Sequence, residues 1–123
     1  MRRLLLALGL GFLLPLAACN AEIPPETLAA IRAGHTLLLD VRTPAEFAAG
    51  HLDGARLVPY EQIAAQIAAL AADKHAAIVL YCHSGRRAGI AQQALLDLGY
   101  TRVVNAGGYA QLSKALAGCT PQC

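Results

Sequence analysis

The residues best suited to chemistry in this 123-residue chain lie in one short stretch, 82–87, with the sequence Cys-His-Ser-Gly-Arg-Arg. An apolar, β-branched run precedes Cys82, and a helix-forming segment follows Arg87. This order predicts a buried strand, a tight turn and a helix N-terminus. Unpaired backbone N–H groups at such a terminus, with two arginines beside them, favour the binding of an anion.

The same surroundings suit Cys82 to nucleophilic chemistry. A cysteine near a helix N-terminus and guanidinium groups can have its pKa lowered from about 8.5 to roughly 3.5–7.5, and the thiolate is the reactive form. A lone cysteine is commonly a small buried core residue. Here the neighbouring Gly85, Arg86 and Arg87 favour a catalytic thiol instead. That role requires a thiol that solvent can reach.

Strands and helices that alternate with short connections must position this loop. Helices are predicted over residues 26–33, 44–49, 61–71, 87–98 and 109–117, and strands over 36–41, 55–58, 78–82 and 102–104, with Gly107-Gly108 as a turn. The pattern predicts an α/β fold, a small and mostly parallel sheet with helices on both faces. Ligands of such sheets bind beyond the carboxyl ends of the strands, which here carry Arg42 and Cys82.

The first 18 residues are typical of a secretory signal. Arg2 and Arg3 precede an apolar stretch, 4–14, that is short and interrupted by glycine. The sequence Leu-Ala-Ala-Cys, ending at Cys19, resembles the lipobox of bacterial lipoproteins, which implies cleavage before Cys19 and its acylation with chains such as palmitate. Leu16 stands where an ordinary secretory cleavage site needs a small residue, so the pattern favours lipidation. Several acyl chains would hold the domain firmly to a membrane.

We therefore expect four segments: a lipoprotein signal peptide (1–18), a lipidated tether (19–25), one compact domain (26–118) and a C-terminal tail (119–123). The resemblance to a lipobox implies a location in a bacterial envelope, anchored on the periplasmic face, and Asn20 favours the outer membrane. Without the two arginines of the signal, eight Lys and Arg balance eight Asp and Glu. This balance gives no basic face for nucleic acid.

The remaining cysteines lie near the C-terminus. In an oxidising compartment Cys119 and Cys123 can close a small disulfide, or they can belong to a frayed tail. No second pair of ligands has the spacing of a zinc site, so we expect no metal.

Three motifs, in order, resemble those of a single-domain rhodanese over residues 24–117. They are Asp-Val-Arg-Thr-Pro-Ala-Glu-Phe-Ala-Ala-Gly-His-Leu-Asp-Gly-Ala (40–55), the Cys-His-Ser-Gly-Arg-Arg loop and Gly-Gly-Tyr (107–109). The resemblance implies the rhodanese fold and sulfurtransferase chemistry. A sulfane sulfur would pass from a small anionic donor such as thiosulfate to a thiophilic acceptor such as cyanide or a thiol. No organic cofactor is required, and we expect a monomer.

Carried over residue by residue, the resemblance makes Cys82 the persulfide-forming cysteine. The substrate-binding candidates are the rest of the loop and one residue of the first motif: His83, Ser84, Gly85, Arg86, Arg87 and Arg42. Several alternatives stay open. Arg42 either binds the anion or pairs with Asp40 or Glu46. Arg87 either binds the anion or pairs with an acid on its own helix. His83 either faces solvent or transfers a proton. The chain lacks the tryptophan that many members carry after the Gly-Gly pair and has Leu112 instead.

Two other functions compete with sulfur transfer. Phosphatases and arsenate reductases of the related type have a longer loop, whereas four residues separate Cys82 from Arg87, so the loop suits a single sulfur better than a phosphate. A lipid-anchored module that binds sulfur or a partner protein without turnover is the second alternative, since a fold does not prove a function.

Overall fold

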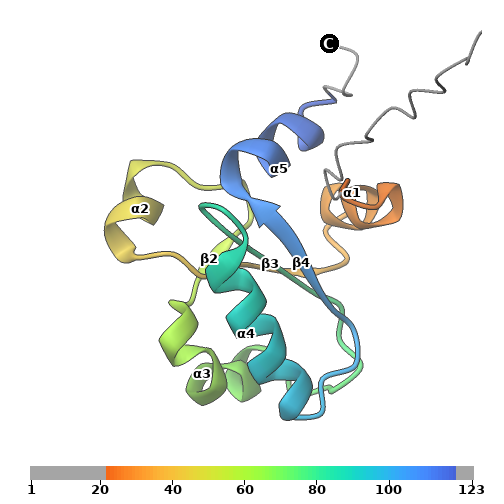
Figure 1. The fold of residues 1–123 in the computed structure, drawn as a ribbon. Helices are drawn as coiled ribbons and strands as arrows, with labels where there is room; N and C mark the ends of the chain where they lie inside the picture. Colours follow the sequence, from red (N-terminus) through yellow and green to blue (C-terminus); the bar gives the residue numbers. More distant parts are fainter. Residues whose placement is uncertain (1–21, 119–123) are drawn as a thin grey trace, which may run out of the picture.

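The computed structural model describes residues 22–118, in which helices and strands alternate (Figure 1). The elements are α1 (Pro25–Arg32), β1 (Leu37–Asp40), α2 (Pro44–Ala49), β2 (Arg56–Leu57), the 3₁₀ helix η1 (Tyr60–Gln62), α3 (Ile63–Leu70), β3 (Ile78–Cys82), α4 (Arg86–Asp97), β4 (Val103–Gly108) and α5 (Tyr109–Leu116). The predicted signal peptide and the predictions for Cys19, Cys119 and Cys123 lie outside the described residues. Within residues 22–118, no helix has the length and apolarity to cross a membrane.

The four strands form one parallel sheet in the order β2-β1-β3-β4, which confirms the predicted α/β fold. Every residue of β3 is buried, because this strand has a hydrogen-bonded neighbour on each side and helices over both faces. Asp40 lies opposite Tyr81 in the register of β1 and β3. The carboxyl ends of these two strands therefore meet at one edge, as predicted, and Cys82 ends the inner one.

Alternate residues of β3 enter two separate cores. Leu80 and Cys82 pack with Ile63 and Ile67 of α3 and with Leu95 of α4. The side chains of opposite parity enter the other core, a set of residues that includes Leu38, Val79, Tyr81, Ala106 and Leu112. Figure 1 shows α3 and α4 on one side of the sheet and α1 and α5 on the other. Helices thus cover both faces, as predicted.

The last strand differs from its prediction. The prediction of a short strand over 102–104, followed by a Gly-Gly turn, is wrong. Instead, β4 continues to Gly108 and leads directly into α5. Leu80 pairs with Asn105 but Cys82 pairs with Gly108, so β4 carries one extra residue there, as in a β-bulge. Gly107, with φ 82°, has the backbone conformation that this irregularity needs.

A buried ion pair fixes the carboxyl end of β1. Asp40 is 0% exposed and Arg42 is 5% exposed, and their Oδ2 and Nη2 atoms are 2.6 Å apart. The Arg42 Nε also donates to both carboxylate oxygens, and Nη2 donates to the carbonyl of Gly50 at 2.7 Å. The hydrogen bond to Asp40 raises the pKa of Arg42. Of the roles left open for Arg42, the structure contains the pairing with Asp40.

Replacing one member of this pair should be costly. Arg42→Ala leaves the Asp40 carboxylate buried without its partner, so we expect the free energy of unfolding to fall by about 3–5 kcal/mol in urea titrations. The double variant Asp40→Leu/Arg42→Met removes both charges and should recover most of that loss. A cost for Arg42→Ala below about 1 kcal/mol, the value of an exposed ion pair, would contradict the prediction.

Candidate active site

The loop after β3 turns the chain so that a backbone amide points at the thiol. Cys82 is the last residue of β3, and Gly85, with φ 91°, is the N-cap of α4. The Gly85 N–H donates to the Cys82 Sγ over 2.9 Å. The predicted strand, turn and helix N-terminus are all present, and the helix begins at Arg86, one residue earlier than predicted.

The loop rests on the glycines at the end of β4. A Cβ atom at Gly108 would lie 2.5 Å from the carbonyl oxygen of His83, and one at Gly85 would lie 3.2 Å from the Cα of Gly107. Real Cβ atoms essentially never make a contact as short as the first, and the second is tighter than nine in ten real Cβ contacts. The Gly-Gly pair of the third motif therefore provides the space in which the loop lies.

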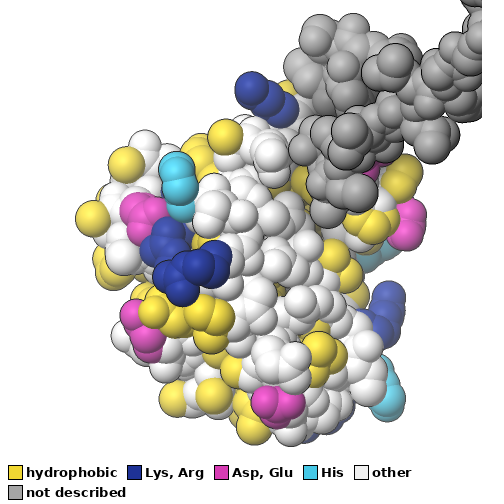
Figure 2. All heavy atoms as spheres, viewed as in Figure 1, with side chains coloured by type: hydrophobic (Ala, Val, Ile, Leu, Met, Phe, Trp, Pro, Cys, Tyr) yellow, Lys and Arg dark blue, Asp and Glu magenta, His cyan; other side chains and the backbone are white. Residues whose placement is uncertain are grey.

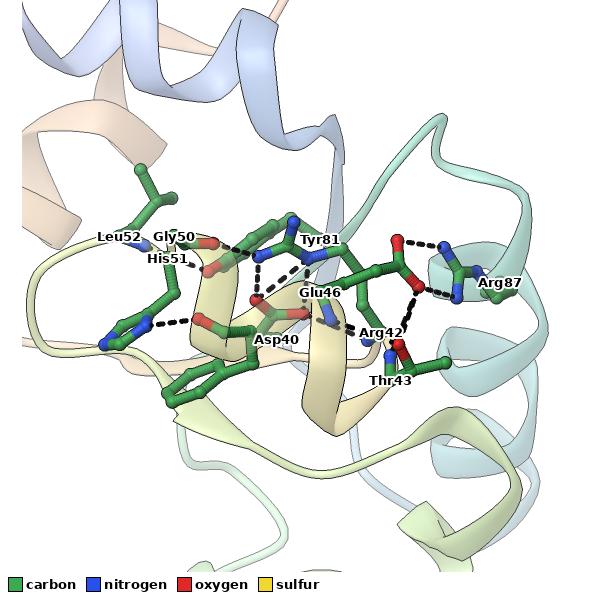
Figure 3. A network of polar contacts seen from close by, with 10 residues as sticks. Asp40, Arg42, Thr43, Glu46, Gly50, His51, Leu52, Tyr81 and Arg87 are labelled. Atoms are coloured by element: carbon green, nitrogen blue, oxygen red, sulfur yellow. Dashed lines mark hydrogen bonds and ion pairs between the residues drawn. The ribbon is translucent and has the colours of Figure 1, made fainter.

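An ion pair joins the loop side of α4 to α2. The two Nη atoms of Arg87 lie 2.8 and 3.0 Å from the two carboxylate oxygens of Glu46, a bidentate contact (Figure 3). Glu46 also accepts hydrogen bonds from the backbone and the hydroxyl of Thr43, as part of the capping box that begins α2. The bonds from Arg87 are the main reason that the pKa of Glu46 falls to about 2. The acid that pairs with Arg87 is thus on α2, not on its own helix.

Cys82 adds to the rise in the pKa of Arg87, of which the hydrogen bond to Glu46 is the main cause. Cys82 itself is 0% exposed. The expectation of a thiol open to solvent is therefore wrong for this conformation. Its neighbours at the surface are His83 and Ser84, both exposed, and the Arg87 side chain, which is 19% exposed. A reagent can reach the sulfur only when part of the structure around it moves.

A hollow of about 380 Å³ lies next to Arg87. Its walls come from the segment that begins α2 and from η1, and they consist of Val41, Arg42, Thr43, Pro44, Pro59, Tyr60, Glu61, Gln62 and Arg87. Cys82 is not part of this lining. The hollow is nevertheless a space for a small molecule beside Arg87.

Arg86 and His83 are the cationic and titratable side chains that the loop exposes to solvent. Among residues 22–118 no carboxylate forms an ion pair with Arg86. Figure 2 shows Lys and Arg side chains gathered in the area between α2 and the start of α4. The exposure of His83 agrees with the solvent-facing alternative. In the same described part of the chain no group of three His, Cys, Asp or Glu side chains could hold a metal ion.

Sequence reasoning missed one residue that touches this loop. The Asn105 Nδ2 donates to the carbonyl of Gly85 over 2.9 Å. A polar side chain within the apolar run that precedes the Gly-Gly pair was the available signal. Glu46 was predicted as a possible partner of Arg42, but its contact with Arg87 joins segments 41 residues apart and could be found only from the fold.

The model of the rhodanese-like domain family matches residues 24–115. The chain therefore belongs to the rhodanese-like domain family.

Relatives and solved structures agree with this assignment. The thiosulfate sulfurtransferase PspE of Escherichia coli is 36% identical over 104 residues, 85% of each chain. The thiosulfate sulfurtransferase GlpE of Pseudomonas aeruginosa is 30% identical over 95 residues, 77% of this chain and 84% of its own length. A structure described as a rhodanese with anions from E. coli has a TM-score of 0.59 at 36% identity, covering 60% of this chain and 87% of that one. The human single-domain sulfurtransferase TSTD1 has a TM-score of 0.62 at 29% identity, covering 73% and 91%.

The close contact between the loop and β4 predicts that Gly108 cannot carry a side chain. Gly108→Ala should lower the free energy of unfolding by about 1–3 kcal/mol, because the new methyl group meets the backbone of His83 and one of the two segments must shift. Gly89→Ala is the matched control, since its Cβ would lie an ordinary 3.5 Å from Asn105. Equal stability of the two variants in urea titrations would show that the loop does not depend on this contact.

Proposed function

We propose that this protein is a thiosulfate sulfurtransferase in which Cys82 carries the transferred sulfur. The observation that carries the proposal is the Gly85 N–H directed at the Cys82 Sγ, at the start of α4, because hydrogen bonds and a helix N-terminus both stabilise an anionic sulfur. The names of the relatives PspE and GlpE support the same reaction. Sulfur transfer therefore takes precedence over a phosphatase.

The proposed reaction has two displacement steps. The Cys82 thiolate attacks the outer sulfur of thiosulfate, the sulfur–sulfur bond of the donor breaks, and sulfite leaves with the electron pair. A thiophilic acceptor, cyanide or a thiolate, then attacks the terminal sulfur of the persulfide and releases the Cys82 thiolate. Neither step needs an external oxidant or reductant, and neither requires a cofactor.

The charges around the loop indicate which arginine serves the donor. Arg42 is bonded to Asp40, and Arg87 is bonded to Glu46, so a carboxylate already balances each of these cations. Arg86 is exposed beside the loop, so we assign it the attraction of the dianion. The anions named in the description of the E. coli rhodanese structure support an anion site in this fold. Because Cys82 is buried, the donor enters as the Arg87 side chain or the loop moves.

Mass spectrometry of the Cys82 peptide tests the covalent step. After incubation with thiosulfate and alkylation, the peptide should carry the additional mass of one sulfur atom, and cyanide should remove it. The Cys82→Ser variant should carry no added sulfur in this peptide. Absence of the adduct with thiosulfate and with other sulfane donors would contradict sulfur transfer. Hydrolysis of a phosphate ester would then favour a phosphatase, and no turnover at all would favour a binding module.

The role of Arg86 predicts a loss of donor capture. Arg86→Ala should lower kcat/KM for thiosulfate about three- to tenfold at low ionic strength, and added salt should reduce the difference because it screens exposed charges. The control is Arg102→Ala, which removes an exposed arginine just before β4. Arg102 therefore lies at the amino end of the parallel strands, whereas Arg86 follows the carboxyl end of β3. An equal loss in both variants, or a loss that salt does not change, would contradict a local role for Arg86.

We further propose the segment boundaries and the location that the N-terminal sequence favours. Residues 1–18 are removed as a signal peptide, Cys19 carries the lipid, and residues 19–25 form the tether. The domain over 26–118 works as a monomer at the periplasmic face of a bacterial envelope membrane. Asn20 favours the outer membrane. In that oxidising compartment Cys119 and Cys123 either close a small disulfide or belong to a frayed tail. The Leu-Ala-Ala-Cys sequence supports this assignment.

Fractionation of cells tests the anchor. Wild-type protein should sediment with membranes, whereas Cys19→Ala should be recovered in the soluble fraction or remain as an unprocessed precursor, because no acyl chain can be attached. Cys119→Ala, which removes a cysteine from the C-terminal tail, should behave like the wild type. Membrane association of a processed Cys19→Ala protein would exclude lipidation as its cause.

A further inference from the structure

We propose that Asn105 is a positioning residue that holds the Gly85 amide in place at the Cys82 sulfur. The role goes beyond the proposed reaction, and it rests on sulfur transfer only for its consequence in turnover. Its direct effect is on the ionisation of a thiol, which can be measured whether or not the protein transfers sulfur.

Three hydrogen bonds of 2.9 Å connect β4 to the thiol through one side chain and one peptide segment. The backbone N–H of Gly107 donates to the Asn105 Oδ1, and the Asn105 Nδ2 donates to the carbonyl of Gly85. The N–H of Gly85 then donates to the Cys82 Sγ. The Asn105 amide therefore acts on the very residue whose own amide contacts the sulfur.

Gly85 needs such external support because glycine has no side chain that could fix its conformation. It has a left-handed φ of 91° at the N-cap of α4, and no side chain caps the helix there. Glycine has the widest range of backbone angles, so the direction of its N–H is set by the groups bonded to it. The Gly85 carbonyl accepts from Gly89 within the helix and from Asn105 across the sheet. The hydrogen bond from Asn105 ties Gly85 to β4.

The position of Asn105 in β4 suits this role. Asn105 pairs with Leu80, and the next pair of the register is Cys82 with Gly108, so Asn105 is the last residue before the irregularity. Its side chain is half-buried and reaches the loop from there. A side chain amide can donate with its nitrogen and accept with its oxygen at once, as both contacts require, whereas an apolar side chain can do neither.

The experiment compares the titration of Cys82 in the full chain and its variants. Thiolate absorbance in the ultraviolet, taken as the difference from Cys82→Ser, isolates this thiol from the other cysteines. Asn105→Leu keeps the size of the side chain, and Asn105→Ala removes it. In both we expect the ionisation equilibrium of Cys82 to become about tenfold less favourable, which moves the titration midpoint to higher pH, since the thiolate loses a well-directed hydrogen bond.

Gln92→Ala is the matched control. Gln92 also links α4 to β4 through a side-chain amide, which donates to the carbonyl of Val103 over 3.0 Å, but it does not touch the loop. The charged and titratable groups near the thiol are unchanged in all these variants: Arg87 of α4, Glu46 of α2 behind it, and Arg86 and His83 beside the loop. A shift confined to the Asn105 variants can therefore be assigned to the lost positioning.

Two outcomes would overturn the proposal: an unchanged midpoint in an Asn105 variant that remains folded in urea titrations, and an equal shift in Gln92→Ala. Sulfur loading of Cys82 from thiosulfate is measured on the same samples. If the wild type does not load but its titration responds to Asn105, the proposed reaction fails and the positioning role stands. If the wild type loads and the titration does not respond, the reaction stands and the positioning role fails.

Discussion

The loop that carries Cys82 lies in direct contact with the backbone of a neighbouring strand, and the rest of the site depends on this close approach. At Gly108 even a methyl group would come within 2.5 Å of the carbonyl oxygen of His83. The end of β4 must therefore be free of side chains, and its extra residue brings Gly108 opposite Cys82. With the loop seated in this way, the Gly85 amide reaches the sulfur.

Charge compensation decides what each arginine can contribute. The two arginines that reach furthest into the structure each have a carboxylate partner, Asp40 for Arg42 and Glu46 for Arg87. Burying a cation without a partner is costly, so these pairs follow from their positions. Arg86 can stay unpaired because water solvates it. A dianion therefore meets an unbalanced charge at the surface, whereas the charges of Arg42 and Arg87 are already balanced.

Much of the fold could be predicted because its signals are local. The apolar run before Cys82 predicted its strand, and α2 has the bounds that were predicted for it, residues 44–49. The extension of β4 could not be read in this way, since its glycines are typical of turns and serve here to admit another segment. The partner of Arg87 and the burial of Cys82 depend on contacts between distant segments, which spacing along one chain does not encode.

The hollow beside Arg87 separates what is fixed in this protein from what can vary. The nucleophile belongs to the most enclosed strand of the sheet, whereas one wall of the hollow is η1, a single 3₁₀ turn between β2 and α3. Short connecting segments of this kind tolerate exchange far better than core strands. A different turn at residues 60–62 would accordingly reshape this hollow without altering the strand that carries Cys82.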